Sequence, residues 1–155
     1  MKEQPTLLLI ETATEICSVA LSFGDDIIAV QEGNDGNSHS KNLIPYIDAA
    51  LKQGHKSLQD LDAVVVSIGP GSYTGLRIGV STAKGIAYSL SIPVITVSSL
   101  ESIANGAKHC WQPENDAQPQ IVPMIDARRM EVFTTRFDYN INILDPITAT
   151  IVEEN

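Results

Sequence analysis

A run of six residues, Ala63-Val64-Val65-Val66-Ser67-Ile68, constrains the fold of this chain more than any other stretch. Because the run is apolar on both faces of an extended chain and rich in β-branched residues, it predicts a strand buried in the middle of a sheet. The run ends at Gly69-Pro70-Gly71, and apolar residues then recur at helical spacing from about Tyr73 to Leu90. A buried strand, a glycine turn and a long helix in this order predict an α/β domain.

The stretch before this run predicts an antiparallel meander. Residues 6–10 are apolar, Cys17–Phe23 alternates in the manner of a half-buried strand, and 27–31 is typical of a third strand after a turn at Gly24. The later elements expected are a helix over Ser40–Gln53, a buried strand over Pro93–Val97 and a helix from Leu100 to about Lys108. The fold class is therefore α/β, with a mixed sheet of antiparallel meander plus parallel strands, flanked by helices.

The chain is predicted to hold one complete domain and part of another. Residues 1–111 form the first domain, and the polar, proline-containing stretch 112–120 is interpreted as a linker. Residues 121–155 begin a second domain with two strand patterns, at 121–125 and 130–137, but contain no helix pattern that would complete a core. We therefore expect this second domain to be incomplete.

Composition narrows the classes of function. The formal net charge is -9, which argues against an independent grip on a nucleic-acid backbone, because such binders usually carry a basic patch. The two cysteines, Cys17 and Cys110, have no second Cys or His at metal spacing, so no metal site is expected. The N-terminus is charged too early for a signal peptide and no apolar run is long enough to span a bilayer, so we expect a cytoplasmic protein without membrane contact.

The glycine-rich stretch Gly69–Gly79 is the most informative motif. It lies between a predicted strand and a predicted helix, where free backbone N–H groups can hold an anion. A phosphate-binding P-loop would need Lys and then Ser or Thr directly after Gly75, where this chain has Leu76-Arg77. The dinucleotide fingerprint also fits badly, because its third glycine falls one place late and Pro70 interrupts the turn. A turn needed only for close helix packing remains the alternative.

Together with three other stretches, this motif closely resembles the TsaB (YeaZ) family. The resemblance covers about residues 6–104 and continues at 125–132. The residues that carry it are Ile10-Glu11-Thr12, His39-Ser40-Lys41-Asn42-Leu43-Ile44-Pro45, Gly69–Gly79 and Thr82-Ala83-Lys84-Gly85-Ile86-Ala87.

The resemblance implies a fold and a role. The fold is that of the actin-like ATPase superfamily, built from ribonuclease H-like halves. The role is that of a non-catalytic scaffold that works with TsaD and the small ATPase TsaE, which together transfer a threonylcarbamoyl group to the adenosine 3′ of the tRNA anticodon. The chain would contact transfer RNA only indirectly, through the complex. A homodimer is expected when TsaD is absent.

The catalytic relative carries a metal-binding H-x-x-x-H pair, and its positions are best matched here by Ser99 and Ile103. Serine is a poor metal ligand and isoleucine is none. The alternative class, an ATP-dependent enzyme of the same superfamily such as a small-molecule kinase, needs a carboxylate base in a cleft. Glu11 and Glu15 lie near the end of the first strand, but neither is an evident base, so we expect no catalytic residue and no metal.

The ancestral phosphate loops of the fold correspond to Thr12–Glu15 and to Gly69–Gly75, and the first contains hydroxyl groups but no lysine. ATP binding is therefore expected only weakly, or at a partner interface. The residues expected to make a weak nucleotide or anion contact are Thr12, Thr14, Gly69, Gly71 and Ser72.

The helix after the glycine loop is the expected docking surface. Its apolar positions recur at alternating spacings of four and three, which is typical of a helix that packs lengthwise on another helix. The same stripe could instead pack on the sheet of its own domain. By resemblance to the family, the residues expected at the partner interface are Tyr73, Leu76, Arg77, Val80, Ala83, Lys84, Ala87 and Tyr88.

Overall fold

The computed structural model describes residues 4–33, 39–110 and 119–152. The chain divides into two compact units. The first unit contains Met1–Ile68 and Ser72–Val97, and the second contains Gly69–Gly71 and Ser98–Asn155. No helix among the described residues is both long and apolar enough to cross a membrane.

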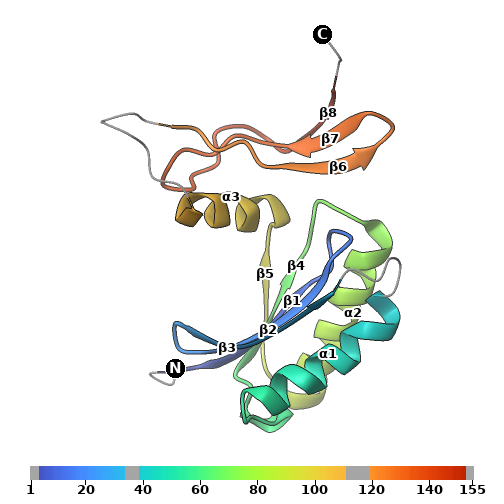
Figure 1. Cartoon of the computed structure of the whole chain (residues 1–155), viewed down its shortest axis with the longest axis vertical. Helices are drawn as coiled ribbons and strands as arrows, with labels where there is room; N and C mark the ends of the chain where they lie inside the picture. The colour runs from blue at the N-terminus through green and yellow to red at the C-terminus, as the bar shows by residue number, and fades with distance from the viewer. Residues whose placement is uncertain (1–3, 34–38, 111–118, 153–155) are drawn as a thin grey trace. The chain divides into compact units, whose positions relative to one another are not determined.

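The first unit is built on one five-stranded mixed sheet (Figure 1). Its strand order is β3-β2-β1-β4-β5. The first three strands pair antiparallel, and β4 and β5 continue the sheet parallel to β1. This arrangement confirms the predicted meander and mixed sheet. The strand bounds are β1 Thr6–Glu11, β2 Cys17–Phe23, β3 Asp26–Gly33, β4 Ala63–Ser67 and β5 Val94–Val97.

Two helices, α1 (His39–Gln53) and α2 (Tyr73–Leu90), cover the same face of this sheet (Figure 1). A short 3₁₀ helix, η1 (Leu58–Asp60), precedes β4. Alternate residues of β1 and β2 point into the core, where Leu8 and Leu21 are fully buried. Burial of large aliphatic side chains from the sheet and the helices makes the main favourable contribution to the free energy of folding of such a unit.

The two parallel strands after β1 differ in burial. As predicted, β4 is central and its side chains are mostly buried. Strand β5, predicted to be buried, instead lies at the edge of the sheet, with Ile95 exposed. The prediction of burial for 93–97 is wrong because a short apolar run looks the same whether it has one neighbouring strand or two.

The second unit has a three-stranded antiparallel sheet in the order β6-β7-β8. Helix α3 (Ser99–Cys110) shares its small core, in which Leu100 and Ala104 pack with Ile125 and Phe137. The unit therefore begins at Ser98, before α3, whereas the sequence placed the boundary after residue 111. Residues 112–118 of the predicted linker lie outside the described residues. The strand bounds are β6 Met124–Arg128, β7 Glu131–Thr134 and β8 Thr148–Ile151.

Helix α2 begins at a glycine turn and a serine cap. Gly69 and Gly71 both adopt positive φ, of 105° and 155°, which glycine tolerates and side chains rarely adopt. The Ser72 Oγ accepts a hydrogen bond from the Gly75 N–H at 3.3 Å, so one of the free donors at the helix start is satisfied. At the other end, Ser91 closes the helix in the left-handed conformation, and its N–H donates to the Ala87 carbonyl.

The inner face of α2 consists of small residues that allow a close approach to β1. Gly75, Gly79, Ala83 and Ala87 are the buried positions of the helix. A Cβ atom added at Gly75 would overlap the carbonyl oxygen of Thr12, and one added at Gly79 would overlap the Thr12 side chain. The helix can therefore sit at this distance only with glycine at both positions.

Substitution of Gly75 tests this packing. We expect Gly75→Ala to lower the free energy of unfolding by about 1–3 kcal/mol, because the added methyl group must displace backbone atoms. Gly85→Ala is the matched control on the same helix, since a Cβ there meets no atom within 4 Å. It should raise stability by about 0.5–1 kcal/mol through helix propensity. Urea unfolding followed by circular dichroism measures both, and equal effects of the two variants would contradict the close approach.

Candidate functional site

The loops after β1 and β4 meet at the carboxyl edge of the first sheet, as the resemblance implies. The Ser72 N–H donates to the Ala13 carbonyl at 2.7 Å, so the start of α2 is tied to the loop after β1. The Ser67 Oγ, at the end of β4, donates to Glu11 Oε1 at 2.8 Å. Asp62 lies at the opposite edge, where it accepts a hydrogen bond from the Thr6 N–H at 2.9 Å. Glu11 and Asp62 therefore do not form one carboxylate cluster.

The hydrogen bonds of the first loop are closed within the chain. The Ala13 N–H donates to Glu11 Oε1 at 2.6 Å, and the Ile16 N–H donates to Thr14 Oγ1 at 3.3 Å. We call the place where the loops after β1 and β4 meet the corner. A phosphate bound there would have to compete with the Glu11 carboxylate for the Ala13 N–H, and the negative charge of that carboxylate would repel it. The loop is therefore not arranged as an open anion cradle.

Thr12, predicted to contact a nucleotide or anion, is 0% exposed. Its side chain faces the α2 backbone at Gly79, and its Oγ1 has no hydrogen-bond partner among the described residues. That prediction is wrong for Thr12, because the close approach of α2 covers the hydroxyl. The contact predicted for Thr14, Gly69, Gly71 and Ser72 stays a prediction.

Ser99 and Ile103, the positions matched to the histidine pair of the catalytic relative, both lie on α3. Ser99 is buried, and its N–H donates to the Gly69 carbonyl at 2.9 Å, whereas Ile103 is exposed. Within residues 4–33, 39–110 and 119–152, no group of three or more His, Cys, Asp or Glu side chains is placed to hold a metal ion.

The outer face of α2 carries the most distinctive exposed surface of the first unit. Tyr73 and Tyr88 are 75% and 90% exposed. The guanidinium of Arg77 lies over the Tyr73 ring, 5.4 Å from its centroid. Exposed aromatic and arginine side chains are the types that interfaces favour. We call this surface the α2 stripe, and it consists of Tyr73, Arg77, Ser81, Lys84 and Tyr88.

The structure divides the predicted interface residues between two faces of α2. Ala83 and Ala87 are 0% and 4% exposed and belong to the core of the first unit, so their assignment to a partner surface is wrong. Both alanines pack in the hydrophobic core with residues of the sheet such as Val64 and Val66. Leu76 and Val80 are half-buried. The other four predicted residues, Tyr73, Arg77, Lys84 and Tyr88, lie on the exposed face.

Sequence reasoning missed two further exposed positions of the first unit, Ser81 and Ile44. Ser81 continues the spacing of four from Tyr73 and Arg77, a signal that was present in the sequence. Ile44 on α1, a helix that contacts α2, is also exposed. The sequence feature that could have identified Ile44 is its place directly after Leu43, because the next residue along a helix faces a different direction from a buried one.

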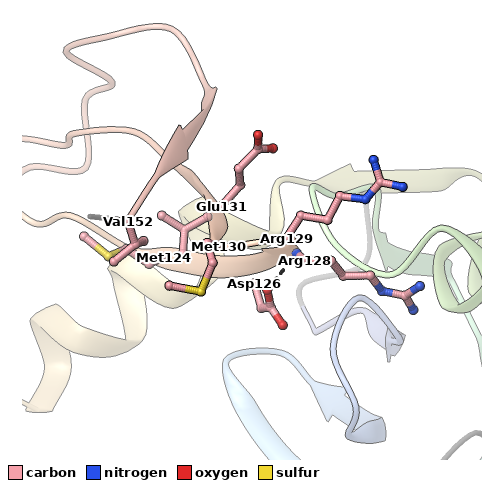
Figure 2. A pocket seen from close by; sticks show the side chains of 8 residues that line it. Met124, Asp126, Arg128, Arg129, Met130, Glu131 and Val152 are labelled. Carbon is pink, nitrogen blue, oxygen red and sulfur yellow. Dashed lines mark hydrogen bonds between the residues drawn. The ribbon is translucent and has the colours of Figure 1, made fainter. Parts of the chain in front are cut away.

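A hollow on the second unit lies beside the β6–β7 turn (Figure 2). Arg128, Arg129 and Met130 form this turn with φ of 68°, 57° and 62°, and the Arg128 N–H donates to Asp126 Oδ1 at 2.7 Å. In Figure 2 the two arginine side chains extend to one side, away from the methionines. The lining residues include two carboxylates and two guanidinium groups, so their charges offset each other. They are Met124, Asp126, Arg128, Arg129, Met130, Glu131, Val132 and Val152.

Shifted pKa values are found in both units. Burial raises the pKa of the Cys17 thiol in β2. In the second unit, hydrogen bonds from Asn142 lower the pKa of Asp138, and the hydrogen bond from Arg136 lowers the pKa of Asp145. Strongly shifted groups often mark catalytic clefts, but these have structural causes.

Taken together, the mixed sheet and the corner at its carboxyl edge place this chain in the actin-like α/β class with a ribonuclease H-like sheet. The solved structure titled "YeaZ from Pseudomonas aeruginosa" superposes with a TM-score of 0.82 at 28% sequence identity, covering 94% of this chain and 67% of that one. A component of (R)-2-hydroxyglutaryl-CoA dehydratase from Acidaminococcus fermentans superposes with a TM-score of 0.51 at 14% identity, a likeness of fold alone.

Sequence comparisons identify the family. The family model described as "TsaD: tRNA N6-adenosine threonylcarbamoyltransferase" matches residues 35–154. The protein named "tRNA threonylcarbamoyladenosine biosynthesis protein TsaB" is 37% identical in Bacillus subtilis (strain 168), over 92% of this chain and 59% of that protein. Its namesake in Haemophilus influenzae is 38% identical, over 83% of this chain and 52% of that protein. This chain belongs to the TsaB (YeaZ) family, and it spans a little over half the length of these relatives.

Removal of two buried hydroxyl groups, those of Thr12 and Ser67, tests the hydrogen bonding at the corner. Thr12→Val should leave the free energy of unfolding unchanged or raise it, because the Thr12 hydroxyl has no partner to lose. Ser67→Ala should lower it by about 1.5–3 kcal/mol, because the Glu11 carboxylate loses a donor. Thermal and urea unfolding measure the change in the free energy of unfolding for both variants. A large loss in Thr12→Val would mean that its hydroxyl is hydrogen-bonded.

Proposed function

We propose that this chain is a non-catalytic partner of TsaD. In this role it acts with TsaD and TsaE in the cytoplasm to support transfer of the threonylcarbamoyl group to the adenosine 3′ of the anticodon in tRNA. Membership of the TsaB family is the observation that carries the proposal. The formal net charge of -9 favours indirect contact with tRNA through the complex.

The exposed face of α2 supplies a surface for such a role. Tyr73, Arg77 and Tyr88 are large side chains with little burial in the first unit, and a partner that covered them would remove apolar area from water. We propose that TsaD binds across this face, and that a second copy of the chain binds there less tightly when TsaD is absent.

The chemistry of the chain supports an accessory rather than a catalytic role. Serine and isoleucine, at 99 and 103, replace the metal-binding histidines of the catalytic relative. A kinase would need a carboxylate free to accept a proton from its substrate. Glu11 Oε1 already accepts hydrogen bonds from the Ala13 N–H and the Ser67 Oγ, which favours a structural part for this side chain.

The proposed function predicts a complex with TsaD that depends on α2. Mixing the chain with TsaD of the same organism should give a one-to-one complex by size-exclusion chromatography with light scattering. Tyr88→Ala should weaken it about tenfold, since an exposed aromatic side chain that a partner buries is often worth about 1.4 kcal/mol or more. Tyr139→Ala, the same change in the second unit, is the control. Absence of a complex with a folded chain would refute the proposal.

Nucleotide binding by the chain alone is predicted to be weak. Titration with ATP and Mg²⁺ in a calorimeter should give a Kd above about 1 mM, because the Ala13 donor is already used and Thr12 is covered. Glu11→Gln removes the negative charge at the corner and serves as the informative variant. Micromolar binding to the unmodified chain, abolished by Glu11→Gln, would favour the ATP-dependent enzyme instead.

A further inference from the structure

The turn between β6 and β7 holds its residues in a backbone conformation that favours other amino acids. Arg128 and Glu131 pair across the hairpin, so Arg129 and Met130 are its two central residues. Positive φ at both central positions, 57° and 62° here, is the mark of a type I′ turn, in which Asn-Gly is strongly preferred. Arg128 also has a positive φ, of 68°. Strained positions of this kind cluster at functional sites, so they indicate a function for the side chains of this turn.

The guanidinium groups of Arg128 and Arg129 have no carboxylate partner. Both residues are exposed, and neither forms an ion pair with another residue in the part of the chain that the structure describes. Two carboxylates line the same hollow, but those of Asp126 and Glu131 point in different directions from each other and from the guanidinium groups (Figure 2). The lining is therefore neutral overall, with its two positive charges together on one side.

The rest of the lining is apolar. It consists of Met124, Met130, Val132 and Val152. Met124 and Met130 are 59% and 61% exposed, although large apolar side chains are usually buried. Methionine is flexible and polarizable, so it adapts to the shape of a partner and is frequent at binding surfaces. The hollow has a volume of about 600 Å³, which is in the range of sites that hold an organic group.

This combination of an apolar lining and two unpaired guanidinium groups favours one class of ligand. A nucleic-acid strand would meet the two carboxylates as well as the arginines, in a chain whose formal net charge is -9. A purely apolar surface would leave both guanidinium groups without acceptors. A protein segment can supply a large apolar side chain with carboxylates beside it, and arginine binds carboxylates through paired hydrogen bonds.

We propose that the hollow beside the β6–β7 turn binds an acidic segment of another protein. One large apolar side chain of that segment occupies the hollow, and its carboxylates pair with Arg128 and Arg129. Charge complementarity is the argument for this occupant. The residues of the site all belong to the second unit and none belongs to α2, so the inference goes beyond the proposed function and does not depend on it.

Synthetic peptides test the two features of the ligand separately. The probe is Gly-Ser-Asp-Phe-Glu-Ser-Gly with both ends blocked. One control peptide has Asn and Gln in place of Asp and Glu, and the other has Ser in place of Phe. Methionine labelled with carbon-13 in its methyl group is the reporter, because two of the three methionines of the chain line the hollow. We expect the probe to shift the NMR signals of Met124 and Met130, and both control peptides to bind at least about fivefold more weakly.

A turn of the preferred sequence separates the side chains from the backbone. Arg129→Asn combined with Met130→Gly keeps the type I′ turn and removes one guanidinium group and one methionine. The temperature of thermal unfolding should stay unchanged or rise, because both new residues favour positive φ, whereas the probe should bind at least about fivefold more weakly. Met124 remains as the reporter. Lys108→Gln removes a positive charge from α3, outside the hollow, and is the control that should bind the probe as the unmodified chain does.

Four results would contradict the proposed site. Methionine signals that do not shift with up to about 5 mM probe would overturn the inference, as would equal binding of the peptide that carries Asn and Gln. Binding that the turn variant weakens no more than Lys108→Gln would also overturn it. Tighter binding of hexauridylate RNA than of the probe would assign the turn to nucleic acid instead. TsaD is absent from this titration, so none of these results bears on the proposed function.

Discussion

The close approach of α2 to the end of β1 is the contact on which the first unit depends. Gly75 and Gly79 place the helix backbone against Thr12, and the alanines that follow keep the same distance along the sheet. Because one face of α2 is used in this way, the opposite face is fixed as the exposed one. The same small residues therefore determine both the core and the surface that a partner would meet.

The sequence predicted the elements of the fold well where the pattern was long or punctuated by glycine. The meander, the central strand at Ala63 and the long helix were all expected, because alternation, β-branched runs and glycine turns report local geometry directly. It failed where the answer depended on neighbours. Nothing local distinguishes the edge strand β5 from a central one, and nothing local shows that α3 packs with Ile125 and Phe137 rather than with the first sheet.

The exposed face of α2 was predicted only in part, because a local sequence pattern does not identify which neighbour a helix packs against. A stripe of small residues indicates that a helix backbone approaches something closely, but it does not say whether that neighbour is the chain's own sheet or another protein. The structure assigns Ala83 and Ala87 to the sheet, and Tyr73 and Tyr88 to the exposed side. The corner is similar, since the sequence placed hydroxyl groups there but gave no sign that Thr12 is covered by α2.

The hydrogen bonds that Glu11 accepts hold the corner in one arrangement. In a loop that waits for phosphate, backbone donors stay unsatisfied until the ligand arrives, and the empty loop tends to fluctuate. Here the Glu11 carboxylate already accepts hydrogen bonds from the Ala13 N–H and the Ser67 Oγ, so it ties the turn at Ala13 to the end of β4. The start of α2 is anchored to that turn through Ser72 and Ala13. The start of α2 is therefore held by hydrogen bonds within the chain.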